Sequence, residues 1–334
     1  MHGSILPRPG RPPDAPTAGL SERTATVAGM ATTTARARPG RIAGIVAVTL
    51  VVAVALAVLV AAVAYVVRAR QTAPPPVPPP EQCLAVVGDY SGAMALDQAA
   101  NAAIIAGESL RRGLPARAVT IALATAWQES WLRNLDWGDR DSLGLFQQRP
   151  SQGWGTPEQI MDPWYASGAF YDALVKVPDW QTGDVNDVAQ AVQRSGVPDG
   201  YRPHEGAARA FASVLTGQAP AVLSCVDRGT TPGDPAVLTD LFRRVWGDRI
   251  TIAPQPSGLL VTAPDDTTAW AVAGLALAST GQAGVTGLAV GPRHWIADPM
   301  RLAVWTDIPA TPAGVTPTPP APTLTASQVL ITLR

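Results

Sequence analysis

The chain has 334 residues, a formal net charge of −1 at pH 7 and only two cysteines. The near-neutral balance argues against general nucleic-acid binding, which leaves a basic footprint. The length allows two domains, or one domain with appendages. Charge is unevenly distributed, because six arginines and two acidic residues precede position 42, whereas 17 basic and 24 acidic residues follow position 80.

Residues 1–41 lack apolar periodicity and are rich in Pro, Thr and Ala, which predicts a disordered tail. Met30 is an alternative start to Met1. Residues 42–67 carry no charge, and about 20 apolar residues suffice to cross a bilayer, so this run predicts a single transmembrane helix. The competing interpretation is a cleaved signal peptide, whose apolar core is shorter, about 7–15 residues.

The excess of arginine before the apolar run places the N-terminus in the cytoplasm and the rest of the chain outside. The arginine bias and the abundant Ala, Val and Pro are typical of a high-GC bacterial genome, so the membrane is a bacterial plasma membrane. Residues 68–82 form a Pro-rich linker, and 73–80 within it predict a stiff polyproline II spacer.

Cys83 and Cys225 both follow the apolar run and bracket one segment. In an oxidising compartment this arrangement predicts a disulfide that joins the two ends of a domain. The alternative is a pair of free, buried thiols.

Between these cysteines the pattern is mostly helical, and a domain of residues 83–228 is expected to be mainly α. A polar, Gly- and Asp-rich stretch at 134–155 interrupts it as a loop or short hairpin. Residues 229–334 alternate helical and β-rich runs and predict a small α+β domain. The helices of the first domain are expected at 96–110, 118–131, 157–175, 184–194 and 204–216.

Glu129 lies near the C-terminal end of the apolar helix expected at 118–131. Burial between aromatic neighbours and the negative end of the helix dipole both raise the pKa of a carboxyl group. A carboxylic acid kept protonated near neutral pH is what a general acid for glycosidic cleavage needs. The alternative is an ordinary solvated glutamate at a helix end.

The surrounding residues resemble the lysozyme-like superfamily, in particular soluble lytic transglycosylases and goose-type lysozymes. Glu129-Ser130 is similar to the family's Glu-Ser pair, and Gly144-Leu145-Phe146-Gln147 is similar to its Gly-Leu-Met-Gln run. Gln147 and Pro150 follow Glu129 by 18 and 21 residues, in agreement with the family spacing. The resemblance covers about 140 residues, 85–225.

The resemblance implies a helical fold with a glycan groove, and a Glu129 that protonates the glycosidic oxygen between N-acetylmuramic acid and N-acetylglucosamine. Lytic transglycosylases then close an anhydro ring with the sugar's own 6-hydroxyl, whereas lysozymes use water. Two-carboxylate glycosidases need a second acid, for which Asp136, Asp139 and Asp141 are candidates, with Asp141 closest in sequence to the Gly-Leu-Phe-Gln run. Routes with one carboxylate and with two are both open at this point. The chain departs from the family at its Ala-Tyr-Asn-Ala-Gly segment, where residues 191–195 read AVQRS.

Several residues are expected to bind substrate beside Glu129. Gln147 matches a position of the family's Gly-Leu-Met-Gln run. Gln193 stands in for the Asn side chain of the family's Ala-Tyr-Asn-Ala-Gly segment, and Tyr201 follows this segment. Tryptophans stack on sugars, and those in expected loops are better groove candidates than those in helices, which are core. The expected substrate-binding residues are Ser142, Gly144, Gln147, Gln148, Trp137, Trp154, Gln193 and Tyr201.

The small number of histidines and cysteines argues against metal-dependent chemistry. The histidines are His2, His204 and His294, and the two cysteines lack metal spacing, so no zinc site is expected. No P-loop or dinucleotide fingerprint occurs, so no cofactor is expected.

Residues 235–334 resemble a zinc peptidase-like domain attached to bacterial cell-wall enzymes. The positions that match its metal ligands are Gln255, Thr262, Gln328 and Leu330, none of which suits zinc. The resemblance therefore implies an inactive enzyme domain reused for packing or wall binding. The alternative is an unrelated accessory domain.

The sequence thus predicts a single transmembrane helix, a mainly α lysozyme-like domain and a small α+β C-terminal domain. The expected function is cleavage of peptidoglycan glycan strands outside the plasma membrane, and the alternative is a catalytically inactive peptidoglycan-binding or scaffold protein. Peptidoglycan and the membrane are the expected partners, with cell-wall or secretion machinery as further candidates and no nucleic acid.

Overall fold

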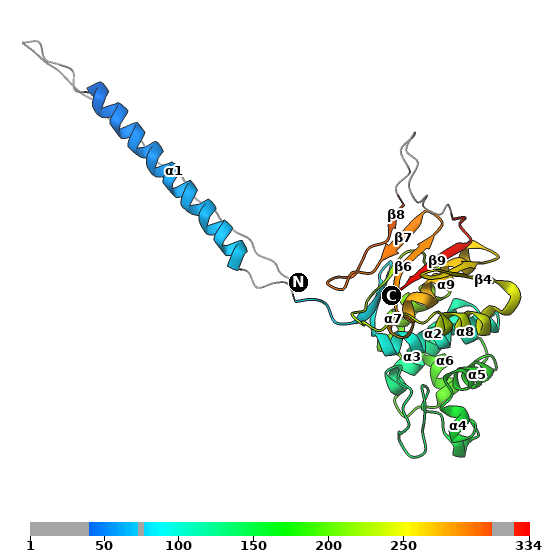
Figure 1. Cartoon of the computed structure of the whole chain (residues 1–334). Coiled ribbons are helices and arrows are strands. Elements are labelled where there is room, and N and C mark those ends of the chain that lie inside the picture. The colour runs from blue at the N-terminus through cyan, green and yellow to red at the C-terminus, as the bar shows by residue number, and fades with distance from the viewer. Residues whose placement is uncertain (1–39, 73–76, 309–323) are drawn as a thin grey trace, which may run out of the picture. The chain divides into compact units, whose positions relative to one another are not determined.

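The computed structural model describes residues 40–72, 77–308 and 324–334. Most of the expected N-terminal tail, half of the 73–80 spacer and the Pro/Thr-rich segment 309–323 lie outside these residues. The described chain divides into an N-terminal unit that ends at Pro75 and a compact unit that spans Pro76–Arg334 (Figure 1).

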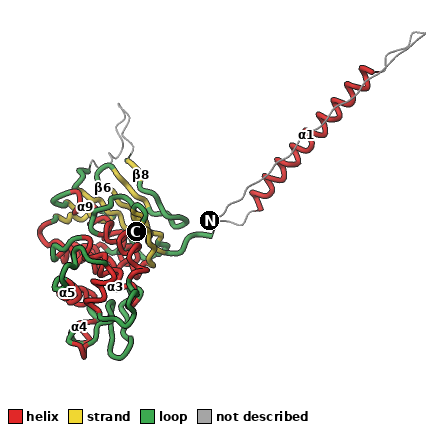
Figure 2. Tube along the Cα trace, turned by 180° about the vertical axis from the view of Figure 1, so that it is seen from behind, coloured by secondary structure: helices red, strands yellow, loops and turns green. Residues whose placement is uncertain are grey.

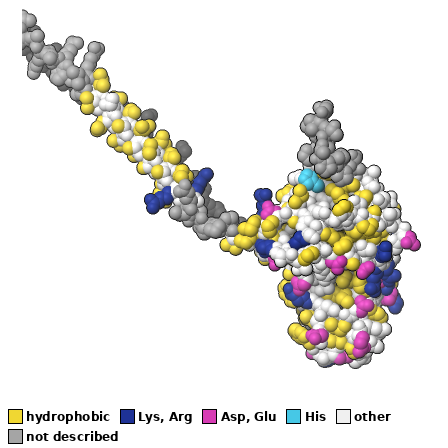
Figure 3. Space-filling model, viewed as in Figure 1, with side chains coloured by type: hydrophobic (Ala, Val, Ile, Leu, Met, Phe, Trp, Pro, Cys, Tyr) yellow, Lys and Arg dark blue, Asp and Glu magenta, His cyan; other side chains and the backbone are white. Residues whose placement is uncertain are grey.

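The N-terminal unit contains one long helix, α1 (Gly40–Thr72). Residues Gly44–Arg70 of this helix are long and apolar enough to cross a membrane. Their hydrophobic side chains cover the visible face of the helix (Figure 3). The apolar run therefore forms a continuous helix, as the sequence predicted.

Most helices of the compact unit lie at one end, and its strands lie at the other (Figure 2). Its helical region is built around α3, which packs against four other helices. The helices of this region are α2 (Leu96–Arg111), α3 (Ala116–Ser130), α4 (Pro157–Ile160), α5 (Pro163–Leu174), α6 (Val185–Gln193) and α7 (Glu205–Leu215).

The expected helix at 157–175 is two helices, because the chain turns at Asp162. The Asp162 carboxylate caps the start of α5 by accepting a hydrogen bond of 2.9 Å from the Trp164 backbone N–H. An Asp before a Pro at the first helical position is a strong start signal. Two helices, separated at Met161 and Asp162, therefore replace the single one.

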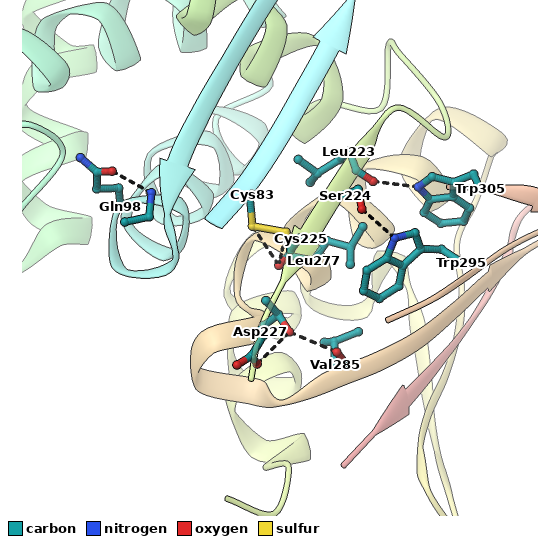
Figure 4. The surroundings of a disulfide bond; sticks show 12 residues. Cys83, Gln98, Leu223, Ser224, Cys225, Asp227, Leu277, Val285, Trp295 and Trp305 are labelled. Carbon is teal, nitrogen blue, oxygen red and sulfur yellow. Dashed lines mark hydrogen bonds between the residues drawn. A yellow bond between two sulfur atoms is a disulfide. The ribbon is translucent and has the colours of Figure 1, made fainter. Parts of the chain in front are cut away.

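The mainly helical region also contains a small sheet that was not expected. Its strands are β1 (Gln82–Val87), β2 (Tyr90–Ala95) and β3 (Leu223–Val226), in the order β2-β1-β3. Cys83 lies directly opposite Cys225 in the β1–β3 pair, and the two form the predicted disulfide (Figure 4).

The C-terminal part forms a six-stranded antiparallel sheet in the order β4-β5-β9-β6-β7-β8. Its strands are β4 (Thr251–Gln255), β5 (Gly258–Thr262), β6 (Val285–Val290), β7 (Arg293–Ile296), β8 (Thr306–Asp307) and β9 (Gln328–Leu333). Three further helices accompany the sheet: α8 (Pro235–Trp246), α9 (Asp266–Ala278) and α10 (Thr280–Ala283).

The helical region and the C-terminal sheet share one core, because α8 and α9 pack on α2 and α9 also packs on α7. Figure 4 shows how β3 joins the two parts. The Trp295 indole N–H donates to Ser224 Oγ at 3.1 Å, and that of Trp305 donates to the Leu223 carbonyl at 2.8 Å. Residues 83–228 and 229–334 are therefore packed together rather than joined only by the chain.

Candidate active site

Glu129 lies in the last turn of α3, a helix whose Ala-rich sequence allows it to be buried on nearly all sides. The helix ends where Trp131 and Leu132 adopt positive φ values of 54° and 57°. Left-handed conformations in non-glycine residues cost energy and cluster at functional sites. The contacts around Trp131 and Leu132 must therefore hold the backbone at the end of α3 in this conformation.

The two halves of the sequence motif meet at this helix end. The Ser130 hydroxyl, which is buried, lies 2.7 Å from the Leu145 carbonyl oxygen and 3.0 Å from that of Ala126. One hydroxyl thus connects α3 to the loop that carries residues 144–147. The Glu-Ser pair and the Gly-Leu-Phe-Gln run are neighbours in space as well as in motif.

The loop that follows α3 folds back on itself through two isolated β-bridges, Leu135 with Gly144 and Leu143 with Gln148. Gly144 has φ +76°, and a Cβ at this position would lie 2.7 Å from the Ile160 carbonyl oxygen. The backbone therefore requires glycine here. Gly144 shapes the loop and contributes no side chain to a ligand.

The carboxyl group of Glu129 is half-buried and accepts a hydrogen bond of 2.7 Å from the Tyr201 hydroxyl. Burial raises the pKa of Glu129, and this effect outweighs the opposing hydrogen bonds from Tyr201 and Gln193. The pKa shift has the direction that a general acid requires.

Gln193 connects Glu129 to a groove. Its side-chain amide contacts Glu129 and donates a hydrogen bond of 2.8 Å to the Phe146 carbonyl. The groove has a volume of about 710 Å³, and Glu129 itself is not among its lining residues. Those residues are Gln152, Trp154, Ala173, Lys176, Val177, Pro178, Ala191, Val192, Gln193 and Arg194. Two of the expected substrate-binding residues, Trp154 and Gln193, thus line one groove.

Asp141 occupies a different environment from Glu129. Its carboxylate accepts hydrogen bonds from the Ser151 backbone N–H at 2.8 Å and from Arg149 Nε at 2.7 Å. The bonds from Ser151 and Arg149 lower the pKa of Asp141 well below its usual range. Asp141 and Glu129 share no partner among the described residues, and the Asp141 contacts hold the 141–151 loop together.

The structure brings only some of the other expected residues to the surface. Trp137 is 68% exposed, and Gln147 donates to its carbonyl oxygen at 3.3 Å, which places both in the outer loop. Ser142 is buried, and Gln148 is buried and donates to the Ala166 carbonyl at 3.1 Å. Neither Ser142 nor Gln148 therefore faces the groove.

Tyr201 is fully buried, and its hydroxyl donates a hydrogen bond to the Glu129 carboxyl. The segment between α6 and α7 carries it, and its backbone N–H bonds to Asn186 Oδ1 at 3.2 Å. Burial and the nearby Glu129 both raise the pKa of Tyr201, so the phenol remains a hydrogen-bond donor.

His204 is a neighbour of this site that the sequence did not indicate. Its ring stacks on Trp127 with centroids 5.9 Å apart and meets Trp131 edge to face at 5.8 Å. Its Nε2 lies 3.1 Å from Gln128 Oε1, and burial lowers the pKa of His204. The only sequence feature that links His204 to the site is its position three residues after Tyr201, and this spacing predicts no contact unless the fold is known.

The positions expected to match metal ligands in the C-terminal part lie on strands of the large sheet. Gln328 and Thr262 are paired across β9 and β5, with Gln328 Nε2 3.5 Å from Thr262 Oγ1. Gln255 ends β4 and Leu330 lies in β9.

The chain matches no protein-family model, and a search of curated proteins gives no match.

Proposed function

We propose that this protein is a membrane-anchored peptidoglycan glycosidase of lysozyme-like fold that cleaves the bond between N-acetylmuramic acid and N-acetylglucosamine. The observation that carries the proposal is the Glu129 carboxyl, which is desolvated, hydrogen-bonded by Tyr201 and linked through Gln193 to a groove. The spacing from Glu129 to Gln147 and Pro150 and the Ser130–Leu145 contact support the lysozyme-like assignment.

Glu129 is the general acid of the proposed reaction. Its raised pKa favours the protonated carboxyl group, and that proton passes to the glycosidic oxygen as the bond to C1 breaks. The Tyr201 hydroxyl stabilises the carboxylate that remains, because a hydrogen bond to a charged acceptor is stronger than one to a neutral acceptor. Proton donation is thereby favoured without a second ionisable partner.

The contacts of Asp141 favour a route with one carboxylate. A second catalytic acid has to flank the scissile bond at a defined separation from the first, whereas Asp141 is committed to Arg149 and Ser151. In the single-carboxylate route, Glu129 takes back a proton from the sugar's 6-hydroxyl, whose oxygen bonds to C1. The product is a 1,6-anhydro sugar, so we propose a lytic transglycosylase.

The helix α1 anchors the protein in this proposal. Its apolar span Gly44–Arg70 reaches across a bilayer, and the arginine-rich segment before it stays in the cytoplasm. The compact unit then lies outside, where the Cys83–Cys225 disulfide persists.

Digestion of purified peptidoglycan by the intact chain in detergent tests the proposal, with mass spectrometry of the released muropeptides. We expect anhydro products from the wild-type chain and a loss of roughly 10²–10⁴-fold in Glu129→Gln, the usual contribution of a general acid. Reducing ends in place of anhydro ends would instead indicate a hydrolase. Binding to the wall without cleavage by the wild-type chain would refute the enzyme and favour a wall-binding protein.

A further inference from the structure

The end of β7 and the segment that follows it carry exposed apolar side chains. Ile296 is 65% exposed, Met300 is 56% exposed and Val304 is 77% exposed. Ile296 and Val304, but not Met300, line a hollow of about 450 Å³ together with Asp298 and Arg301. A single exposed apolar residue is normal on a soluble surface, but three on one short loop mark an interaction site. We name this segment, residues 296–304, the apolar loop.

The apolar loop lies beside the point where the linker enters the compact unit. Arg228 joins the two, because its side chain donates to the Pro299 carbonyl at 2.9 Å and also to the Pro79 carbonyl. The Arg228 backbone N–H donates to Glu81 at 2.7 Å. In Figure 1 the orange segment between β7 and β8 projects next to the incoming chain.

The chain itself limits how far the linker entry can be from α1. Eight residues, 73–80, separate the end of α1 from Glu81. A chain extends by at most about 3.6 Å per residue, so these residues span at most about 29 Å. The apolar span of α1 has 27 residues, or about 40 Å of helix at 1.5 Å per residue, which exceeds the hydrocarbon core of about 30 Å. The linker therefore starts near the lipid headgroups.

We propose that the apolar loop inserts into the outer face of the membrane that α1 spans. This inference rests on the membrane anchor of the proposed function. Ile296, Met300 and Val304 enter the interfacial region, and the exposed Arg301 guanidinium, which pairs with Asp298 at 2.6 Å, meets the lipid phosphates. The compact unit is then held against the bilayer by two contacts, the linker and the loop.

A fluorescent reporter at Met300 tests the proposal in the full-length chain. Both native cysteines form the disulfide, so a thiol reagent labels only the added residue in Met300→Cys. The labelled chain is reconstituted into vesicles of phosphatidylcholine and phosphatidylglycerol that contain a nitroxide-labelled lipid. We expect the emission of the reporter to shift to the blue and to be quenched by the nitroxide-labelled lipid. Iodide in the water should quench it little. Val175→Cys, an exposed apolar position at the end of α5, is the matched control and should respond only to iodide.

A second variant separates lipid insertion from general proximity. Val304→Asp in the Met300→Cys chain should remove the lipid quenching, because a carboxylate resists entry into the interface, whereas Val304→Leu should retain it. Val304 is exposed, so neither change disturbs the core.

Three other outcomes would each contradict loop insertion, and each points to a different reason. A chain that floats with the vesicles but has a Met300 reporter open to iodide keeps the anchor and refutes loop insertion. A reporter shielded from both quenchers means that protein, such as a second copy of this chain, covers the loop. A chain that does not float with the vesicles refutes the anchor, and the inference falls with it.

Discussion

The Tyr201 hydroxyl donates a hydrogen bond of 2.7 Å to the Glu129 carboxyl across a separation of 72 residues. It joins the end of α3 to the segment between α6 and α7. The bond favours the ionised form of Glu129, whereas burial favours the neutral form and dominates. The protonation state of Glu129 is thus set by two opposing effects, one of which a single substitution can remove.

Tyr201→Phe should therefore shift the pH dependence of cleavage. Without the phenol, the pKa of Glu129 rises further, because only the favourable bond to its charged form is lost. A general acid works while protonated, so the loss of activity at high pH should move to higher pH. Rates of release of muropeptides measured across the pH range check this. A profile that keeps its alkaline limb unmoved while the rate falls would assign Tyr201 a purely structural role.

Glu129→Gln should make the protein more stable at neutral pH, even as it reduces cleavage. A carboxyl whose pKa is raised by folding stabilises the folded state below its unfolded pKa, and this contribution is lost as pH rises through the folded pKa. Glutamine does not ionise, so the variant lacks that loss. The difference in melting temperature between variant and wild type should therefore grow from acid to neutral pH, starting near the unfolded pKa of about 4.3. A difference that is constant with pH would contradict the raised pKa.

Asp141→Asn distinguishes the routes with one and two carboxylates. We expect a modest loss of activity, because the change weakens the contacts to Arg149 and Ser151 without removing a proton donor. If Asp141 were a catalytic acid or nucleophile, its loss would approach that of Glu129→Gln, roughly 10²–10⁴-fold. Muropeptide release by both variants under identical conditions makes the comparison.

The helices were predictable because their sequences carry helical periodicity and clear ends. The ends of α6 lie within one residue of its expected range, 184–194, since Asp184 caps the helix by accepting from the Asn186 backbone N–H at 3.0 Å. The β1–β2 hairpin was missed, although Gly88-Asp89 lies between paired strands and Gly88 has φ +57°. Glycine-aspartate is a two-residue hairpin signal, but the alanine-rich β2 strand has low β-propensity and obscured it.

The candidate site was only partly predictable for a different reason. Glu129 and the 144–147 run are close in sequence, and their spacing carries a local signal. The partners of Glu129 come from α6 and the segment after it. No local sequence pattern predicts that this segment packs against the end of α3. The sequence also does not distinguish Gln147 from its neighbour Gln148, which the structure shows to be buried. Tertiary packing decides which polar side chain faces the groove.

Ser130→Ala should destabilise the loop that follows α3. The substitution leaves the buried Leu145 carbonyl without the hydroxyl that bonds to it, and an unsatisfied buried group costs about 1–3 kcal/mol. Urea denaturation should show a loss of this size in the free energy of unfolding. Ser213→Ala is the control, since its hydroxyl bonds only to the Arg209 carbonyl within α7. Equal losses in the two variants would mean that the contact to Leu145 contributes nothing.

The disulfide should make a large contribution to the stability of the compact unit. Cys83 and Cys225 close a loop of 142 residues, for which loop-closure entropy gives a stabilisation of about 5 kcal/mol as an upper value. For a protein of this size, each kcal/mol shifts the melting temperature by roughly 2–4 °C. Melting with and without reductant should show the loss in the wild-type chain and no effect of reductant in the double variant Cys83→Ala, Cys225→Ala. Because the cysteines are also opposed across the β1–β3 ladder, the sheet should still form at low temperature without the bond. A wild-type melting temperature that reductant leaves unchanged, with the bond shown to be broken by mass spectrometry, would mean that the β1–β3 pairing and the tryptophan contacts to β3 hold this part of the fold together alone.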